Sequence, residues 1–574
     1  MRTTRALLTS APPTPNGDLH LGHIGGPYMA ADVQNRYLRM RGVDSYYLCG
    51  SDDNLSWVLT NGRQYGMGPQ EAADHFSDEV DATLHAARIE MDVFARPNTS
   101  AFHRPMVQAF VRRLYDGGHL VAKTGPSPWC PSCRRYLFEA YIRGNCPNCG
   151  ALSGGNYCED CALPNDCIDL ANAYCADCGA TPERREFTRL FFPTGRHVDV
   201  LERFHREVKM PPHLRSMCER TIEKGLPDVC ISHIADWGIP VGIEGFEGQV
   251  IYAWCEMAPR YLAYTAELLS RQGEDPRDWQ RFWCREDSRV VQCFGFDNGF
   301  WYSLFIPALF KAYDPSIRLQ AALVSNEFYR LEGKKFSTSR KHAIWGRELL
   351  ADATPDEARF YLAYTCPETE RTNFTRAGFE EVVARELIEG WQEWLAGLGE
   401  TIARESGGLA PEPPEPPTPD TESAWTPEQQ RFAAALARLA GDAATAYEAE
   451  TFSPQAAART LCEVARLARR FGKAEDWWAT VPARAATRRI GLALELAAAR
   501  LLAQTAAPLM PDFAARLAAD LGFAGPLAWE ELPAWVPAGQ PVGRLDAVYF
   551  PPIRSSLQSA AAPAAAVQTA APVA

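Results

Sequence analysis

The sequence predicts an α/β protein whose fold is interrupted by a cysteine-rich, metal-binding segment and followed by a helical region. Three observations support this prediction. Strand-like and helix-like segments alternate over residues 1–125 and again over 291–350. Eight cysteines form four CxxC pairs between these two regions. Apolar residues recur with the 3.6-residue period of a helix within 425–525. At about 150 residues per domain, a chain of 574 residues is long enough for several domains.

The composition is that of a folded protein. Apolar residues make up 46% of the chain and charged residues 22%, which excludes a mostly disordered or fibrous chain. The net charge of −13 excludes a wholly basic coat for nucleic acid but leaves a local basic face open. No run of 18 apolar residues occurs, and the first residues lack the apolar stretch of a secretory signal. We therefore expect a cytoplasmic protein without a membrane segment.

The first α/β region opens with a short strand over Arg5–Ser10, the turn APPTPNG and a helix from about Gly22 to Met40. The segment Ser45–Gly50 is aromatic-rich and ends in glycine, which predicts the next strand. Downstream, VVQCFGFDNG predicts a strand that leads into a loop, and WYSLFIPALFKAY predicts a helix. Segments 375–405 and 425–525 are expected to be helical.

Two segments are expected to lie outside the packed elements. Residues 408–424 are proline-rich and acidic, which is typical of a solvated loop or linker. Residues 551–574 end the chain in a low-complexity Ala/Pro tail, which we expect to be disordered.

The four CxxC pairs predict two structural zinc sites. Each pair supplies half of a tetrahedral thiolate site, so two pairs form one four-cysteine site, and such a closed site leaves no position for catalysis. Three ways of combining the pairs remain open, and free buried thiols are the alternative. The ninth cysteine of this block, Cys167, is interpreted as a spare thiol. The predicted ligands are Cys130, Cys133, Cys146, Cys149, Cys158, Cys161, Cys175 and Cys178.

Two further segments are suited to phosphate. His20-Leu21-Gly22-His23 opens a predicted helix, where a glycine permits close approach, backbone N–H groups attract phosphate, and two imidazoles can donate to developing charge. Gly333–Arg340 (GKKFSTSR) is a basic, hydroxyl-rich loop suited to clamping a triphosphate. A polar helix start and a solvated turn are the alternatives for the two segments.

Together these segments resemble the HIGH and KMSKS signatures of class I aminoacyl-tRNA synthetases. The wider sequence resembles the methionyl-tRNA synthetase family over roughly residues 5–525, and its two-knuckle cysteine block resembles the archaeal and eukaryotic branch. The segments that carry the resemblance, in the order and spacing of that family, are APPTPNGDLHLGHIGGPYMAADVQNRYLRMRG, CGSDDN, the four cysteine pairs, IYAWCEMAPRY, FGFDNGFWYSLFIPAL and EGKKFSTSRKHAIW.

The resemblance implies a Rossmann-type parallel-sheet catalytic domain in two halves, 1–125 and 241–350. A connective-peptide insertion with zinc knuckles, residues 126–240, is expected to separate them. An α-helical, anticodon-binding-like domain is expected over 351–550. In such a catalytic domain the ligand binds at the carboxyl ends of the parallel strands.

The resemblance implies that ATP, with Mg²⁺, activates an amino acid, which is then transferred to tRNA. Methionine is the favoured amino acid. The protein is expected to be a monomer. The implied catalytic residues are His20, His23 and Lys335. The implied ATP-binding residues are Gly22, Gly295, Asp297, Lys334, Lys335, Ser337 and Ser339. The implied amino-acid-binding residues are Pro12, Thr14, Asp52, Trp254, Tyr261, Asn298 and Tyr302. Asp52 matches the acid that pairs with the substrate's α-ammonium; a strand-end turn acid is the alternative.

Several positions depart from the family's pattern. Thr14 stands where a tyrosine usually follows the proline of the first turn, Tyr302 stands for a histidine and Phe296 for a lysine. Met257 lies in a stretch that normally reads L-D-A-P, and Thr338 replaces the second lysine of KMSKS. A second hypothesis therefore stays open: a specialised paralogue that activates another amino acid or supplies aminoacyl-tRNA to a biosynthetic pathway.

The helical region contains a candidate surface for tRNA. From Arg459 to Arg489 the chain has eight Lys/Arg against three acids, a charge excess that suits RNA phosphates, although a solvated helix face is the alternative. Trp478 lies where the family stacks a tryptophan on an anticodon base. The family's other anticodon-reading positions fall at Glu393 and Gly397, which predicts weakened anticodon discrimination. The predicted tRNA-binding residues are Trp478, Arg469 and Arg470.

Overall fold

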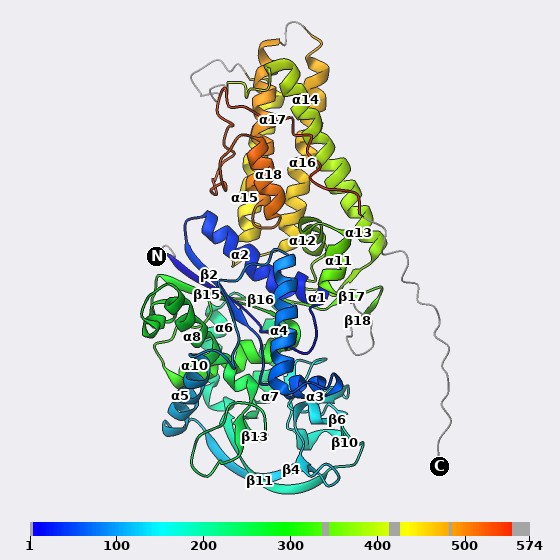
Figure 1. Ribbon diagram of the computed structural model, residues 1–574. Coiled ribbons are helices and arrows are strands. Elements are labelled where there is room, and N and C mark those ends of the chain that lie inside the picture. The colour runs from blue at the N-terminus through cyan, green and yellow to red at the C-terminus, as the bar shows by residue number, and fades with distance from the viewer. Residues whose placement is uncertain (1–3, 336–343, 413–424, 482–484, 554–574) are drawn as a thin grey trace, which may run out of the picture.

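The computed structural model describes the chain except for residues 1–3, 336–343, 413–424, 482–484 and 554–574. An α/β body and a zinc-knuckle insertion lie at one end of an elongated molecule, and a bundle of long helices lies at the other (Figure 1). The predicted fold class, a parallel sheet with an inserted cysteine-rich segment and a following helical region, is confirmed.

The centre of the α/β body is a five-stranded parallel sheet with the order β16-β15-β1-β2-β3. Strand β1 lies in the middle and pairs in register with both neighbours, Leu7 with Tyr46 on one side and with Val290 on the other. The strands predicted near residues 5–10 and 45–50 are confirmed. The strands are β1 (Arg5–Ser10), β2 (Asp44–Gly50), β3 (Val93–Ala95), β15 (Ser288–Gly295) and β16 (Ala322–Asn326).

Both faces of this sheet are covered, which explains why β1 is buried at every position after Arg5. Successive side chains of a strand point to opposite faces. Accordingly, Leu8 packs into the core beneath α2 (Met29–Met40), whereas Leu7 packs into a second core with α5 (His103–Asp116) and α8 (Ala253–Arg271).

The strand order reverses between β1 and β15, because β2 and β3 extend the sheet on one side of β1 while β15 and β16 extend it on the other. In a sheet of this kind the carboxyl ends of the strands at such a reversal form a crevice for a ligand. The loops after β1, β2 and β15 therefore define where a site is expected.

The insertion is built from antiparallel strands. The long strands β4 (Val121–Cys130) and β11 (Glu183–Pro193) pair from Val121↔Phe191 to Trp129↔Glu183 within a four-stranded sheet. A separate three-stranded sheet, β10-β6-β7, carries the second knuckle, and its strands are β6 (Ile142–Asn145), β7 (Leu152–Gly154) and β10 (Ala171–Cys175).

The helical body continues directly from the core of the α/β body. Arg359 of α12 (Pro355–Tyr364) joins the two bodies, since its buried guanidinium pairs with Asp32 of α2 at 2.6 Å and donates to the Leu509 carbonyl at 2.6 Å. The long helices are α14 (Glu393–Ser406), α15 (Pro427–Tyr447), α16 (Pro454–Trp478), α17 (Ala485–Ala506) and α18 (Pro511–Asp520), and the π-helical segment η8 (Val383–Gln392) precedes α14.

Within the described residues, no helix is both long enough and apolar enough to cross a membrane.

Candidate active site

The segment after β1 carries the two predicted histidines. Helix α1 (Leu21–His23) begins at His20, whose backbone N–H donates to His23 Nδ1 at 3.3 Å. The two imidazole rings stack, with centroids 3.7 Å apart. Burial lowers the pKa of His20, and the adjacent His23 lowers it further, so at neutral pH His20 is an uncharged hydrogen-bonding group.

A β-carbon would be crowded at Gly22 and Gly295, two of the predicted nucleotide-binding positions. A β-carbon at Gly22 would lie 3.1 Å from the His20 ring. A β-carbon at Gly295, the last residue of β15, would lie 2.6 Å from Asp297 Oδ1. Asn298 donates to that same Asp297 oxygen at 3.2 Å, so the loop after β15 is folded tightly around its acid.

The structure brings the HLGH segment next to the residues that follow the basic loop. The Leu21 N–H donates to the Ile344 carbonyl at 3.2 Å, and the Gly346 N–H donates to the Leu19 carbonyl at 2.8 Å. At the other end of the loop, β18 (Lys334–Lys335) pairs with β17 (Tyr329–Leu331). Segments more than 300 residues apart in the chain thus meet at one edge of the sheet. The predicted Ser337 and Ser339, with Thr338, lie outside the described residues.

Asp52 follows β2 and is fully buried beside the loop after β1, where its N–H donates to the Pro13 carbonyl at 2.9 Å. Its carboxylate is already paired, because Arg260 Nη2 of α8 lies 2.7 Å from Asp52 Oδ1. Glu256, one helical turn earlier on α8, lies 3.5 Å from the same guanidinium. Arg260 and Glu256 were not predicted as site residues; a glutamate and an arginine four positions apart, close to Trp254 and Tyr261 in the sequence, were the available signal.

The aromatic residues predicted to bind the amino acid lie close together. Trp254 stacks on Trp301 with centroids 4.6 Å apart. The Tyr261 hydroxyl donates to the Ser10 carbonyl at 2.9 Å and shares a 2.9 Å hydrogen bond with the Tyr302 hydroxyl. Trp254, Tyr261 and Tyr302 are therefore brought together as predicted, whereas Trp301 was not predicted.

Met257 and Tyr302, two residues that differ from the family's usual pattern, are in contact with each other. The Tyr302 hydroxyl lies 3.9 Å from the Met257 sulfur, and both side chains are buried. From the insertion, Tyr157 packs against Trp254, with centroids 5.8 Å apart. A thioether and a phenol thus meet among these aromatic side chains. Pro12 and Thr14 are only partly buried in the loop after β1.

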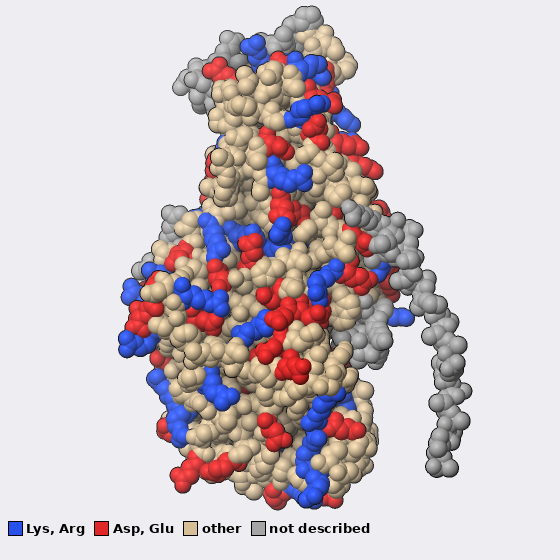
Figure 2. Space-filling view, in the orientation of Figure 1, with Lys and Arg blue, Asp and Glu red and all other residues tan. Residues whose placement is uncertain are grey.

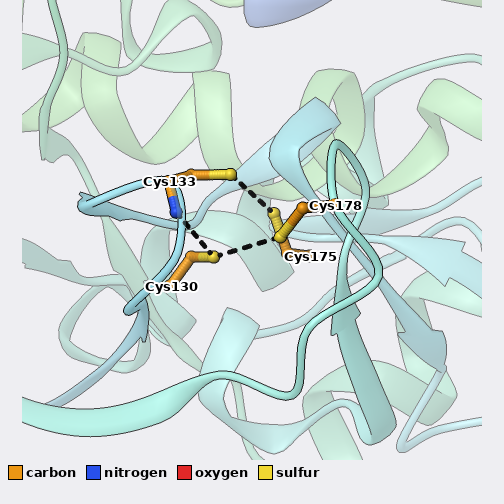
Figure 3. Close-up of side chains that lie close together, drawn as sticks. All are labelled: Cys130, Cys133, Cys175 and Cys178. Atoms are coloured by element: carbon orange, nitrogen blue, oxygen red, sulfur yellow. Dashed lines mark hydrogen bonds between the residues drawn. The ribbon is translucent and has the colours of Figure 1, made fainter.

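The eight predicted cysteine ligands gather into two clusters, and this resolves the pairing that the sequence left open. Within each cluster the four sulfur atoms lie within 4.8 Å of one another, and Cys167 belongs to neither. The first cluster, Cys130, Cys133, Cys175 and Cys178, joins β4 to β10 (Figure 3). The second is Cys146, Cys149, Cys158 and Cys161.

The sulfur spacing fits zinc. Four thiolates bound tetrahedrally at about 2.3 Å lie about 3.8 Å from one another. The measured Sγ–Sγ distances include 3.8 Å for Cys133–Cys175 and 3.8 Å for Cys149–Cys158. Four thiols with no carboxylate or open position form a structural donor set, so the two clusters fit two structural zinc ions.

The predicted tRNA-binding residues lie on α16, and part of their charge is neutralised. Arg469 pairs with Glu393 of α14 at 3.0 Å and donates to the Glu389 carbonyl at 2.7 Å. Arg470 is exposed. At the end of the helix the rings of Trp477 and Trp478 meet edge to face, and Trp477 is 63% exposed. On the face shown in Figure 2, acidic and basic side chains are interspersed over the helical body.

Comparisons with known proteins agree with this geometry. The family model for tRNA synthetases class I (M) matches residues 6–396. A methionine–tRNA ligase of Pyrococcus horikoshii is 32% identical over 421 residues, which cover 71% of this chain and 58% of that protein. One of Parabacteroides distasonis is 33% identical over 391 residues, covering 67% and 56%. One of Porphyromonas gingivalis is 29% identical over 537 residues, covering 92% and 76%.

The chain therefore spans less than two thirds of the length of the first two relatives. Among solved structures, the Mycobacterium tuberculosis methionyl-tRNA synthetase in complex with methionyl-adenylate superposes with a TM-score of 0.76 at 18% identity, covering 95% of this chain and all of that one. This likeness extends the agreement in fold to the helical body.

Proposed function

Since the chain belongs to the tRNA synthetases class I (M) family, we propose that it is an ATP-dependent ligase that attaches methionine to tRNA. The observation that carries this proposal is the contact of the HLGH segment with the residues that follow the basic loop, through the Leu21–Ile344 and Leu19–Gly346 hydrogen bonds. This arrangement is suited to a nucleoside triphosphate at the carboxyl ends of β1 and β15.

The reaction has two steps. A carboxylate oxygen of the amino acid attacks the α-phosphorus of ATP, bound with Mg²⁺, and pyrophosphate leaves to give an aminoacyl adenylate. A hydroxyl at the 3′ end of tRNA then attacks the acyl carbon, and AMP leaves. In both steps the protein's contribution is orientation of the reactants and stabilisation of charge.

In this proposal His20 and His23 donate hydrogen bonds to the phosphate oxygens as charge develops on them. Gly22 and Gly295 leave room for the nucleotide, with Asp297 at the end of β15. Lys335, together with Lys334, Ser337 and Ser339, holds the leaving pyrophosphate. Neutral imidazoles suit this role because they donate a proton in a hydrogen bond without binding ATP electrostatically before the reaction.

For the amino acid, the proposed pocket combines Pro12, Thr14 and Asp52 with Trp254, Tyr261, Asn298 and Tyr302. Aromatic walls suit the apolar thioether side chain of methionine. The two zinc ions stabilise the fold of the insertion, since each cluster joins two CxxC pairs that are separate in the sequence.

The test is aminoacylation of a methionine tRNA transcript with labelled methionine. We expect charging by the purified protein and loss of charging when His20 and His23 are both replaced by alanine. A control that replaces the exposed His85 of α4 (Pro69–Ala86) should charge normally. No charging by the unaltered protein would contradict the proposal.

One set of observations favours the second candidate, a specialised paralogue. Asp52 is neutralised by Arg260, Met257 and Tyr302 fill part of the pocket, and Arg469 is paired with Glu393 on the proposed tRNA surface. Each of these changes affects recognition of the substrates while leaving the ATP-binding segments intact. We further propose that the protein acts as a monomer, which sedimentation would test. Its proposed location is the cytoplasm, which cell fractionation would test.

A further inference from the structure

Asp52, a residue of the proposed amino-acid pocket, belongs to a buried cluster of charges whose other members have no role in the proposed reaction. Asp52, Glu256 and Arg260 have side chains no more than 3% exposed. His103 at the start of α5 and Asn54 in the loop after β2 complete the cluster, and both are buried as well. Such a cluster is costly to bury unless its groups are matched.

The contacts of this cluster are unequal. Arg260 makes its short contact with Asp52, at 2.7 Å, and lies farther from Glu256, at 3.5 Å. Glu256 Oε2 instead accepts from Asn54 Nδ2 at 3.0 Å and lies 3.1 Å from His103 Nε2. Burial lowers the pKa of His103, which therefore brings no second positive charge. Asp52 is thus matched by Arg260, whereas Glu256 is held mainly by Asn54 and His103.

This arrangement changes what Asp52 offers to a ligand. A lone buried carboxylate attracts an ammonium group strongly and disfavours a neutral group in its place. A carboxylate already paired with a buried guanidinium has lost most of that preference, because an added cation would be repelled by the arginine at close range.

We propose that Arg260 is a specificity-determining residue, and that the site accepts carboxylic acids with an uncharged 2-substituent, such as 2-hydroxy acids, about as well as the corresponding amino acid. The inference rests on the proposed function. The activation step allows it, since a carboxylate oxygen attacks the α-phosphorus, pyrophosphate leaves, and the 2-substituent neither gains nor loses a bond.

The experiment compares binding of L-methionine with binding of the 2-hydroxy acid that has the same side chain, by calorimetry on the full chain. The ratio of the two dissociation constants is independent of the fraction of folded protein. For the unaltered protein we expect a ratio below about tenfold. In Arg260→Met the ratio should shift toward methionine by about tenfold or more, as expected when a close charge pair is removed.

Two further variants make the test specific. Glu256→Gln removes the competing partner of Arg260 and should move the ratio in the opposite direction, toward the hydroxy acid. Arg189→Met breaks another arginine–aspartate pair, that of the buried Arg189 with the half-buried Asp166 at 3.0 Å in the insertion, and should leave the ratio unchanged.

The inference is overturned if the unaltered protein prefers methionine by more than about tenfold, or if Arg260→Met leaves the ratio where it was. Failure of the proposed function is a different result: neither acid binds, and neither methionine nor the hydroxy acid supports exchange of pyrophosphate with ATP. That result would overturn the inference as well.

Discussion

The imidazole rings of His20 and His23 stack face to face, with their centroids 3.7 Å apart and their planes inclined by 14°. Each ring fixes the orientation of the other, and the His20 N–H holds His23 Nδ1 at 3.3 Å. The helix start thus presents a rigid pair of ring nitrogens before any nucleotide binds, which is the preorganisation that stabilises developing charge most effectively.

Replacing His23 with alanine should therefore slow adenylate formation by about 10²–10³-fold, as for the loss of one preorganised donor to a transition state. The measurement is exchange of labelled pyrophosphate into ATP. His85→Ala, at an exposed position of α4, is the matched control and should exchange at the normal rate. A normal rate for His23→Ala would remove this residue from the chemistry.

Metal analysis of the purified chain should find about two zinc ions, one for each cysteine cluster. Cys146→Ser should lower the content to about one, because three thiolates and a hydroxyl bind zinc less tightly. Cys167→Ser, in the buried cysteine that belongs to neither cluster, should retain both ions. A folded chain without zinc would disprove the structural role of the clusters.

The helical body should lose stability as the pH rises through neutrality, because of Glu495 on α17. Burial raises the pKa of Glu495 from 4.5 to about 7, while Trp394 Nε1 donates to its Oε1 at 2.8 Å. The folded chain therefore binds this proton more tightly than the unfolded chain, and the stability it contributes is lost between pH 4.5 and about 7.

Glu495→Gln keeps an acceptor for Trp394 and removes the ionisation. At pH 8 the variant should be more stable than the unaltered protein by about 2 kcal/mol, and at pH 4.5 the two should be nearly equal. Urea unfolding at the two pH values measures the difference. Equal stability of the two proteins at pH 8 would show that ionisation of Glu495 does not lower the free energy of unfolding.

On the proposed tRNA surface, Glu393→Gln should strengthen binding of tRNA, because it frees Arg469 from its 3.0 Å ion pair. The dependence of the binding constant on salt should steepen by about one phosphate contact. Glu381→Gln removes the Arg385–Glu381 pair between α13 (Arg376–Val382) and η8 while Arg385 stays paired with Glu386 at 3.0 Å, so this variant controls for net charge alone. Equal effects of the two variants would mean that Arg469 does not lie against the RNA.

Local patterns predicted much of this fold. The strand over Arg5–Ser10 and the helix after the turn were predicted, because both depend on neighbouring residues, and β1, α1 and α2 lie there. The cysteine pairs were recognised for the same reason. Which pairs combine into one cluster was not predicted, because this depends on contacts between strands such as β6 and β10, whose paired residues are about 30 positions apart.

The content of the amino-acid pocket was the least predictable feature. The contact of Asp52 with Arg260 joins residues 208 positions apart, and it forms only because α8 packs against β2 and β3. Tyr157 reaches Trp254 from the insertion, a contact that no periodicity within either segment indicates. Comparison with a family's motif identified the positions, but not what this chain's own side chains do there.

The measurement that tests the proposed function most directly is exchange of pyrophosphate with ATP in the presence of each of the twenty amino acids in turn. We expect methionine to stimulate exchange more than any other amino acid, and the stimulation to disappear when His20 and His23 are both alanine. Stimulation by a different amino acid, with none by methionine, would contradict methionine–tRNA ligase activity and favour the specialised paralogue.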